Sequence, residues 1–96
     1  MGVIIKYDID YLISLIYELN KDVSIEYSEY LSKDIPIVKQ IENLADKLLI
    51  TDQGQCNNDN ISILELHNFN VYPLESDSFG WLIGGIFTYK GIVTYG

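Results

Sequence analysis

The sequence contains no arginine. Its six basic residues are all lysines, and they stand against 14 acidic residues, which gives a formal net charge of −8. A bidentate arginine clamp on a phosphate or carboxylate is therefore excluded. Sequence-neutral binding to a nucleic-acid backbone requires a basic face, which so few lysines among so many acids disfavour. We therefore expect no direct nucleic-acid partner.

Cysteine and histidine occur once each, as Cys56 and His67. One cysteine excludes an intramolecular disulfide, and together with one histidine it cannot complete a zinc site. No basic neighbour in sequence activates Cys56, and its distance from His67 in the fold stays open at this point. The Asx-rich stretch 51–60 lacks the spacing of a calcium loop, and the glycines at 80–85 lack the ending of a phosphate loop. We expect no metal, no cofactor and no catalytic residue.

Long hydrophobic runs are also absent. The longest weakly polar stretch, residues 79–87, is shorter than the roughly 20 residues of a membrane helix, and the apolar run 3–5 is too short for a secretory signal. Apolar residues make up 48% of the chain and charged residues 21%, as in an ordinary globular domain. We expect a single cytoplasmic domain over residues 1–96 without a membrane partner. Frequent Ile, Tyr, Asn and Lys, whose codons are AT-rich, indicate a low-GC bacterial or phage genome.

Two helices are predicted in the N-terminal half. Between residues 9 and 20, apolar side chains recur at helical spacing, and either Asp8 or Asp10 can cap the helix. A second helix at about 35–49 is predicted from the spacing of Ile37, Ile41, Leu44 and Leu48. Asp34 is its expected N-cap, and Pro36 falls in its first turn, where a missing N–H is harmless.

The C-terminal half changes to a period of two from Ile61 onward, which predicts strands. We expect turns at 67–70 and 90–91, a polar loop at 75–78, and a strand at 79–89 in which Gly84 and Gly85 form a hairpin turn or a bulge. The predicted fold class is α+β, with the N-terminal helices packed on a C-terminal antiparallel sheet of three or four strands.

Two short segments remain ambiguous. Residues 3–5 are read as a strand or as an extended lead-in to the first helix. In residues 21–31, the alternation of Val23, Ile25 and Tyr27 indicates a strand, whereas Ser24 or Ser28 could start a short helix. We favour the short helix, over residues 25–32.

Tyrosines interleaved with carboxylates are the pattern that points to a partner. They occur in two groups, of which the first is Glu26, Tyr27, Glu29 and Tyr30 and the second is Asp8, Asp10 and Tyr11. Tyrosine is enriched at protein interfaces, and surrounding carboxylates steer a chain toward a basic surface. The alternative is that the rings lean on the core while the acids only solvate the surface.

The functional hypothesis is a small acidic protein-binding domain without catalysis. It would inhibit or neutralise a basic partner of the nucleic-acid-binding or nuclease type, as phage anti-defence and immunity-type proteins do. The alternative is a homo-oligomeric structural or assembly module whose C-terminal edge strand pairs across a two-fold axis to form a homodimer. An enzyme that uses Cys56, His67 or paired carboxylates is the third hypothesis.

Overall fold

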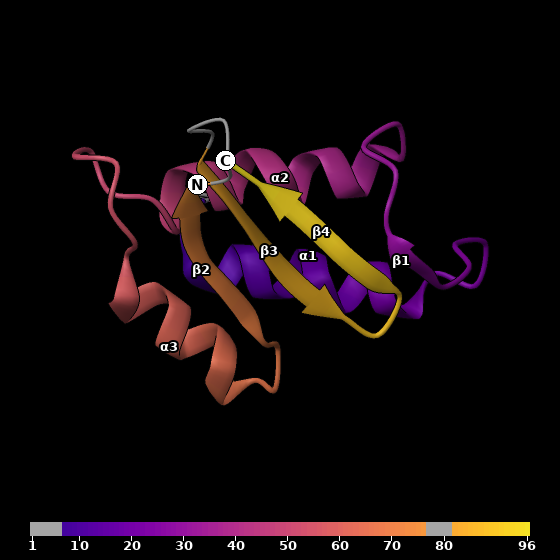
Figure 1. Cartoon of the computed structure of the whole chain (residues 1–96). Coiled ribbons are helices and arrows are strands. Elements are labelled where there is room, and N and C mark those ends of the chain that lie inside the picture. Colours follow the sequence, from indigo (N-terminus) through magenta and orange to yellow (C-terminus); the bar gives the residue numbers. More distant parts are fainter. Residues whose placement is uncertain (1–6, 77–81) are drawn as a thin grey trace, which may run out of the picture.

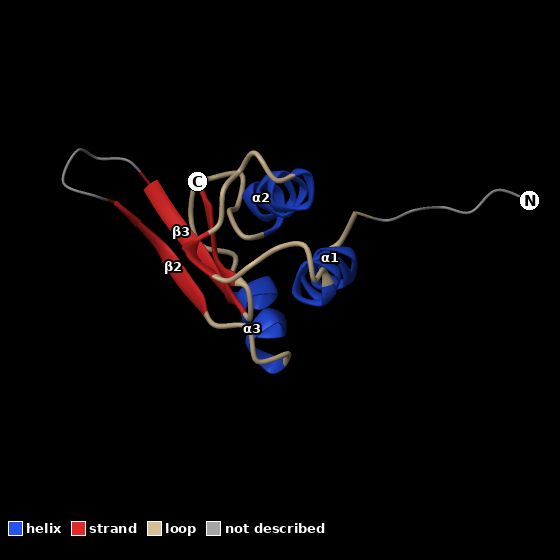
Figure 2. Ribbon diagram, turned by 90° about the vertical axis from the view of Figure 1, so that its right-hand side faces the viewer, coloured by secondary structure: helices blue, strands red, loops and turns tan. Residues whose placement is uncertain are grey.

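Three helices and a four-stranded sheet form two layers in the computed structural model of the chain, which describes residues 7–76 and 82–96. The helices lie on one side of the sheet (Figures 1 and 2). In chain order the elements are α1 (Ile9–Lys21), β1 (Ser28–Tyr30), α2 (Pro36–Leu48), α3 (Asn58–Leu66), β2 (Val71–Ser76), β3 (Leu82–Thr88) and β4 (Gly91–Tyr95). The predicted α+β class is confirmed. None of the helices in the described ranges is long and apolar enough to cross a membrane.

The sheet has the order β1-β4-β3-β2. Strands β2, β3 and β4 form the predicted antiparallel part, but β1 pairs with β4 in parallel, so the sheet is mixed. The short helix favoured at 25–32 is wrong, because the backbone there bonds to β4. The N–H of Ser28 donates to the carbonyl of Lys90 (2.9 Å), and the N–H of Leu31 donates to that of Ile92 (3.0 Å).

Helix α1 begins as predicted, with Asp8 as its N-cap: the Asp8 carboxylate accepts a hydrogen bond from the N–H of Tyr11 at 3.2 Å. Helix α2 differs at its start. Pro36 opens it, and Ile35 occupies the N-cap position without a side-chain bond, so the prediction that Asp34 caps α2 is wrong. Proline at the first helical position presets the backbone angle and has no N–H to be capped.

The strand predicted to begin at Ile61 is wrong, because this segment is helix α3. The side chain of Asn57 caps α3 by accepting from the N–H of Asn60 (3.3 Å), and the amide of Asn60 donates to the carbonyl of Leu48 (2.8 Å). Ile61 and Leu64, three residues apart, are the buried side chains of α3. The polar Asx-rich stretch therefore ends in a capped helix, and local alternation misled the prediction.

The predicted loop 75–78 is wrong in its first half, since Glu75 and Ser76 belong to β2, and the rest of it lies outside the described residues. Residues 3–5 and the start of the strand predicted at 79 lie outside them as well. Pro73 falls within β2, which is an edge strand and so tolerates a missing ladder donor.

The core lies between the helices and the sheet. The largest fully buried side chains come from every helix and from β3 and β4, and they include Phe69 in the turn before β2. The Tyr95 ring belongs to this core and is 2% exposed. Its hydroxyl donates to the backbone carbonyl of Tyr72 at 3.1 Å, which satisfies the one polar atom of the ring.

Gly84 and Gly85 lie inside β3, opposite Tyr95 and Thr94 of β4, so the predicted hairpin turn is wrong. The register shifts of the sheet lie instead in β2, between Tyr72 and Glu75, and in β1, between Ser28 and Tyr30. Successive strand residues face opposite sides, so the two glycines leave space on both faces. The Tyr95 ring occupies the space at Gly84 on the core side, and the Tyr72 ring occupies the space at Gly85 on the other side.

The two glycines differ in what a methyl group would meet. In Gly84→Ala the new Cβ would clash with the buried Tyr95 ring, whereas in Gly85→Ala it would meet the half-exposed Tyr72 ring, which can move aside. We expect Gly84→Ala to lower the free energy of unfolding by about 2 kcal/mol, and Gly85→Ala to change it by less than about 1 kcal/mol. Urea denaturation of both variants measures this, and equal losses would contradict it.

Burial raises the pKa of Tyr95 to about 12 from the ordinary 10.0, and the nearby Cys56 and Asp46 add to the shift. The fold thus favours the neutral phenol. The stabilisation of the fold by the neutral Tyr95 phenol is complete below pH 10 and is lost as the pH rises toward 12. Tyr95→Phe should cost about 1 kcal/mol at neutral pH, because the bond to Tyr72 is lost. It should also remove one late-titrating tyrosine from the ultraviolet titration; an unchanged titration curve refutes the assignment.

Candidate functional site

The chain between α1 and α2 runs along one end of the sheet (Figure 1), and residues 22–34 of it are here called the acidic edge segment. Its acidic residues are Asp22, Glu26, Glu29 and Asp34. All four predicted site residues in this segment are exposed, with Tyr27 at 74% and Tyr30 at 59%. The first predicted group of tyrosines and carboxylates therefore lies on one solvent-facing stretch.

Two apolar side chains and one turn hold the acidic edge segment in place. Ile25 and Leu31 are buried and attach the stretch to the core on either side of Glu26–Tyr30. Before Ile25, the Asp22 carboxylate accepts from the hydroxyl (2.6 Å) and the N–H (2.9 Å) of Ser24. These two bonds, with a smaller effect from Lys90, hold the pKa of Asp22 below its ordinary value. The outward residues are thus displayed from a fixed backbone.

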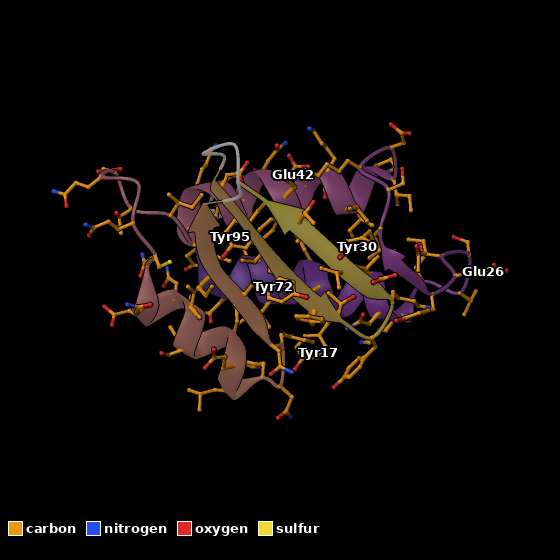
Figure 3. The ribbon with its side chains drawn as sticks, in the orientation of Figure 1. Tyr17, Glu26, Tyr30, Glu42, Tyr72 and Tyr95 are labelled. Carbon is orange, nitrogen blue, oxygen red and sulfur yellow. The ribbon has the colours of Figure 1, made fainter. Side chains whose placement is uncertain are left out.

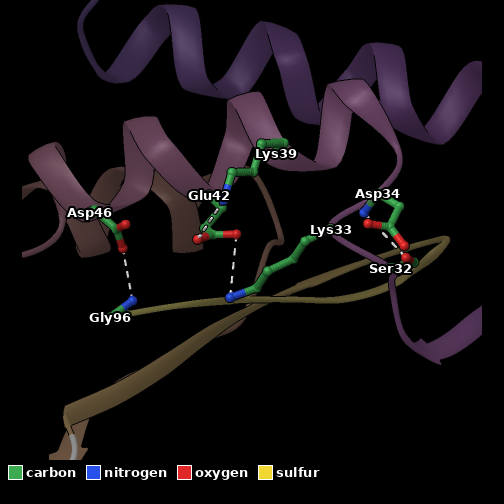
Figure 4. A network of polar contacts seen from close by, with 7 residues as sticks. All are labelled: Ser32, Lys33, Asp34, Lys39, Glu42, Asp46 and Gly96. Carbon is green, nitrogen blue, oxygen red and sulfur yellow. Dashed lines mark hydrogen bonds and ion pairs between the residues drawn. The ribbon is translucent and has the colours of Figure 1, made fainter.

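Two lysines, Lys33 of the acidic edge segment and Lys39 of α2, form ion pairs with α2, as Figure 4 shows. Glu42 of α2 pairs with Lys33 (3.3 Å) and with Lys39 (3.7 Å). Among the described residues these are the ion pairs that the structure contains, and neither includes Glu26 or Glu29. Within the described residues, the carboxylates of Glu26 and Glu29 therefore face solvent outside any salt bridge.

A shallow pocket of about 620 Å³ opens beside the acidic edge segment. The residues that line it include the acidic Glu26 and Asp34, Tyr30 and three serines, together with the apolar Ile25, Leu31, Ile35 and Pro36. Carboxylates and hydroxyl oxygens accept hydrogen bonds, and a tyrosine face attracts a cation. This lining suits the end of a lysine or arginine side chain.

The second predicted group lies elsewhere. Asp8, Asp10 and Tyr11 lie at the first turn of α1, and the length of that helix, about 20 Å, separates them from the acidic edge segment. Asp8 serves as the helix cap, and Tyr11 is half-buried with its ring edge-on to Tyr7 at 5.0 Å. Tyr11 also lines a groove of about 340 Å³ between α1 and α2. The seven predicted residues therefore do not form one surface.

The sequence interpretation missed a further surface, the side of the sheet that faces away from the helices (Figure 2). Its side chains include Tyr30, Tyr72, Phe87 and Ile92, here called the bare sheet face. Tyr30 pairs with Ile92, and Ile92 with Phe87, and residues paired across strands point to the same side. The period-two alternation of β3 and β4 was the available signal, but it does not say which face the helices cover.

Cys56 and His67 do not form a dyad. They lie at opposite ends of α3, whose nine residues span about 14 Å. Cys56 pairs with Ile50 in an isolated bridge, and the Tyr17 hydroxyl and Nδ1 of His67 are joined by a hydrogen bond of 3.1 Å. In the described part of the chain, no three His, Cys, Asp or Glu side chains gather in a way that could hold a metal ion.

Comparisons of the chain with protein-family models, with curated proteins and with solved structures found no match. The function therefore has to follow from the residues of this chain and their arrangement. Two described surfaces offer chemistry for recognition: the acidic edge segment, which is charged, and the bare sheet face, which is apolar.

The turn at Asp22 gives a test of how the acidic edge segment is held. The pKa of Asp22 in the folded protein lies below its ordinary 3.8. The Asp22 carboxylate therefore stabilises the turn at neutral pH, and this stabilisation is lost as the pH falls through the folded pKa. We expect the Ser24 amide to be protected from hydrogen exchange at neutral pH and to lose protection in acid. In Asp22→Ala the exchange rate of this amide should be close to that of an unstructured peptide at both pH values. Equal protection in the two proteins at neutral pH would contradict this role of Asp22.

Proposed function

We propose that the chain is a small acidic protein-binding domain that inhibits or neutralises a basic protein of the nucleic-acid-binding or nuclease type. Phage anti-defence proteins and immunity-type proteins act in this manner. The observation that carries the proposal is the acidic edge segment: Glu26 and Glu29 face solvent outside the ion pairs of the described residues, beside the exposed rings of Tyr27 and Tyr30.

Physical chemistry supports this match. A nuclease or nucleic-acid-binding protein presents lysines and arginines where phosphates bind, and carboxylates at those positions satisfy the same cations. The net charge of −8 steers such a partner toward the chain. Tyr27 and Tyr30 add contact area at a small cost in conformational entropy, because each ring has few rotatable bonds.

The alternative is a homo-oligomeric module that pairs through a C-terminal edge strand. Strand β4 lies between β1 and β3, so the edge strand that the C-terminal sheet offers for this pairing is β2. Two copies of a chain with a net charge of −8 repel each other, which disfavours such a homodimer. A homodimer remains a prediction of the sequence.

The test compares charge reversal at two ends of the sheet. Glu26→Lys with Glu29→Lys should weaken binding to a basic nuclease at least tenfold, because the contacting carboxylates become cations. The matched control is Asp52→Lys with Glu65→Lys, which makes the same change of net charge at two exposed positions in and beside α3, at the far end of the sheet. A panel of purified basic nucleases is titrated with each protein by calorimetry at low and high salt, and nuclease activity is assayed in parallel.

We expect at least one nuclease to bind the unmodified chain in a salt-sensitive way and to lose activity. The control should keep most of that affinity. The proposal is overturned if no member of the panel binds at low salt, or if the two charge-reversed proteins weaken binding to the same degree.

A further inference from the structure

The bare sheet face carries one large side chain from each of its four strands: Tyr30 of β1, Ile92 of β4, Phe87 of β3 and Tyr72 of β2. The rings of Tyr72 and Phe87 are in edge contact, with centroids 4.6 Å apart. Figure 3 labels Tyr30 and Tyr72, which come from the two outer strands. Together these side chains form a row across the sheet.

Gly85 forms the floor of this row. A Cβ atom at Gly85 would lie 2.7 Å from Cδ2 of Tyr72 and 3.1 Å from Cγ2 of Ile92, so both side chains lie low over the glycine backbone. Ile92 is only 9% exposed as a result, whereas Tyr72 remains 44% exposed and Tyr30 59%. The bare sheet face is thus a shallow apolar surface with tyrosines at both ends.

A sheet that packs helices on one side usually carries polar residues on the other. Here no described helix covers the row, and its members are aromatic or aliphatic, although Thr94, which pairs with Gly85, places one polar side chain on the same face. With strands about 4.8 Å apart, the row spans about 14 Å from β1 to β2. The largest contiguous apolar patch on a soluble protein is often a binding site.

We propose that the bare sheet face is the apolar centre of the surface that binds the basic partner, and that the partner segment lying on it combines lysine or arginine with apolar side chains. This inference rests on the proposed function and deepens it. Tyr30 connects the bare sheet face with the acidic edge segment, because it belongs to the row and directly follows Glu29. Protein interfaces have this arrangement, with aromatic residues at the centre and charged residues at the rim.

Charge and area favour this occupant over the others. A stable dimer buries about 800 Å² on each partner, which exceeds the row alone, and a second copy would bring like charge to it. Single-stranded nucleic acid stacks on aromatic rows, but it also requires a cationic groove, whereas the acidic edge segment borders this one. A cationic segment with apolar side chains satisfies both the row and its acidic border.

Two synthetic peptides of about 12 residues serve as probes, each long enough in extended form to cross the row. One alternates lysine with valine, and the other alternates lysine with glycine, so their charges are equal and only the first carries apolar side chains. Both are titrated into the full chain by calorimetry and by two-dimensional NMR. We expect the lysine–valine peptide to bind about tenfold more tightly and to shift the amide signals of Phe87 and Ile92.

The variant Tyr72→Ser with Phe87→Ser should abolish the difference between the peptides. Tyr7→Ser with Leu66→Ser removes two exposed apolar side chains that lie outside the row, and it should preserve the difference. Circular dichroism confirms that each variant is folded. Tyr30→Ser, at the most exposed position of the row, provides a second variant that removes no buried side chain and should reduce the difference.

The outcomes separate the two proposals. If both peptides bind equally, and Glu26→Lys with Glu29→Lys removes that binding, the apolar centre is refuted while the basic partner stands. If the nuclease panel and both peptides fail to bind, the proposed function is refuted as well. If the lysine–valine peptide binds more tightly but Tyr72→Ser with Phe87→Ser does not change this, the site lies elsewhere and the inference is overturned.

Discussion

The close approach of the Ser28 carbonyl to Gly91 is the contact on which the arrangement of this chain depends. A Cβ atom at residue 91 would collide with that oxygen, and Gly91 also has a φ of +138°, which disfavours any other residue. The approach lets β1 join β4 in parallel. As a consequence β4 becomes an inner strand, Leu31 enters the core, and the residues between Ile25 and Leu31 are displayed at the border of the sheet.

Glu42 is the acidic residue that forms ion pairs within the described part of the chain. Glu42, only slightly exposed, holds both Lys33 and Lys39, so two of the six lysines lie against α2. The carboxylates of Glu26 and Glu29 keep their full effect on an approaching cation as a result. Four of the 14 acidic residues lie in the acidic edge segment, and complementary charge of this kind guides the approach of a partner.

The two faces of the sheet are related through the glycine pair of β3. Gly84 admits the Tyr95 ring into the core, and Gly85 lets the Tyr72 ring lie on the opposite face. The Tyr95 hydroxyl donates to the Tyr72 backbone, so one tyrosine anchors the strand that carries the other. The glycine pair is therefore required both for the packing of the core and for the bare sheet face. A methyl group at Gly84 would disturb the core, and one at Gly85 would disturb the bare sheet face.

The sequence by itself determined α1, α2, the α+β class and the excess of negative charge, because helical periodicity and composition are local properties. It failed at α3, where Ile61 and Ile63 have the spacing of a strand although Ile61 and Leu64 are the buried pair of a helix. It also failed at 25–32, where the strand exists only through its bonds to Lys90 and Ile92. It also grouped Asp8, Asp10 and Tyr11 with Glu26–Tyr30, which α1 holds apart. Only the tertiary structure decided which strands are edges and which face of the sheet the helices leave open. It also decided that Tyr30 lies on that face, next to the acidic edge segment. The physical reason is that pairing between residues some 60 positions apart leaves no local pattern in the sequence.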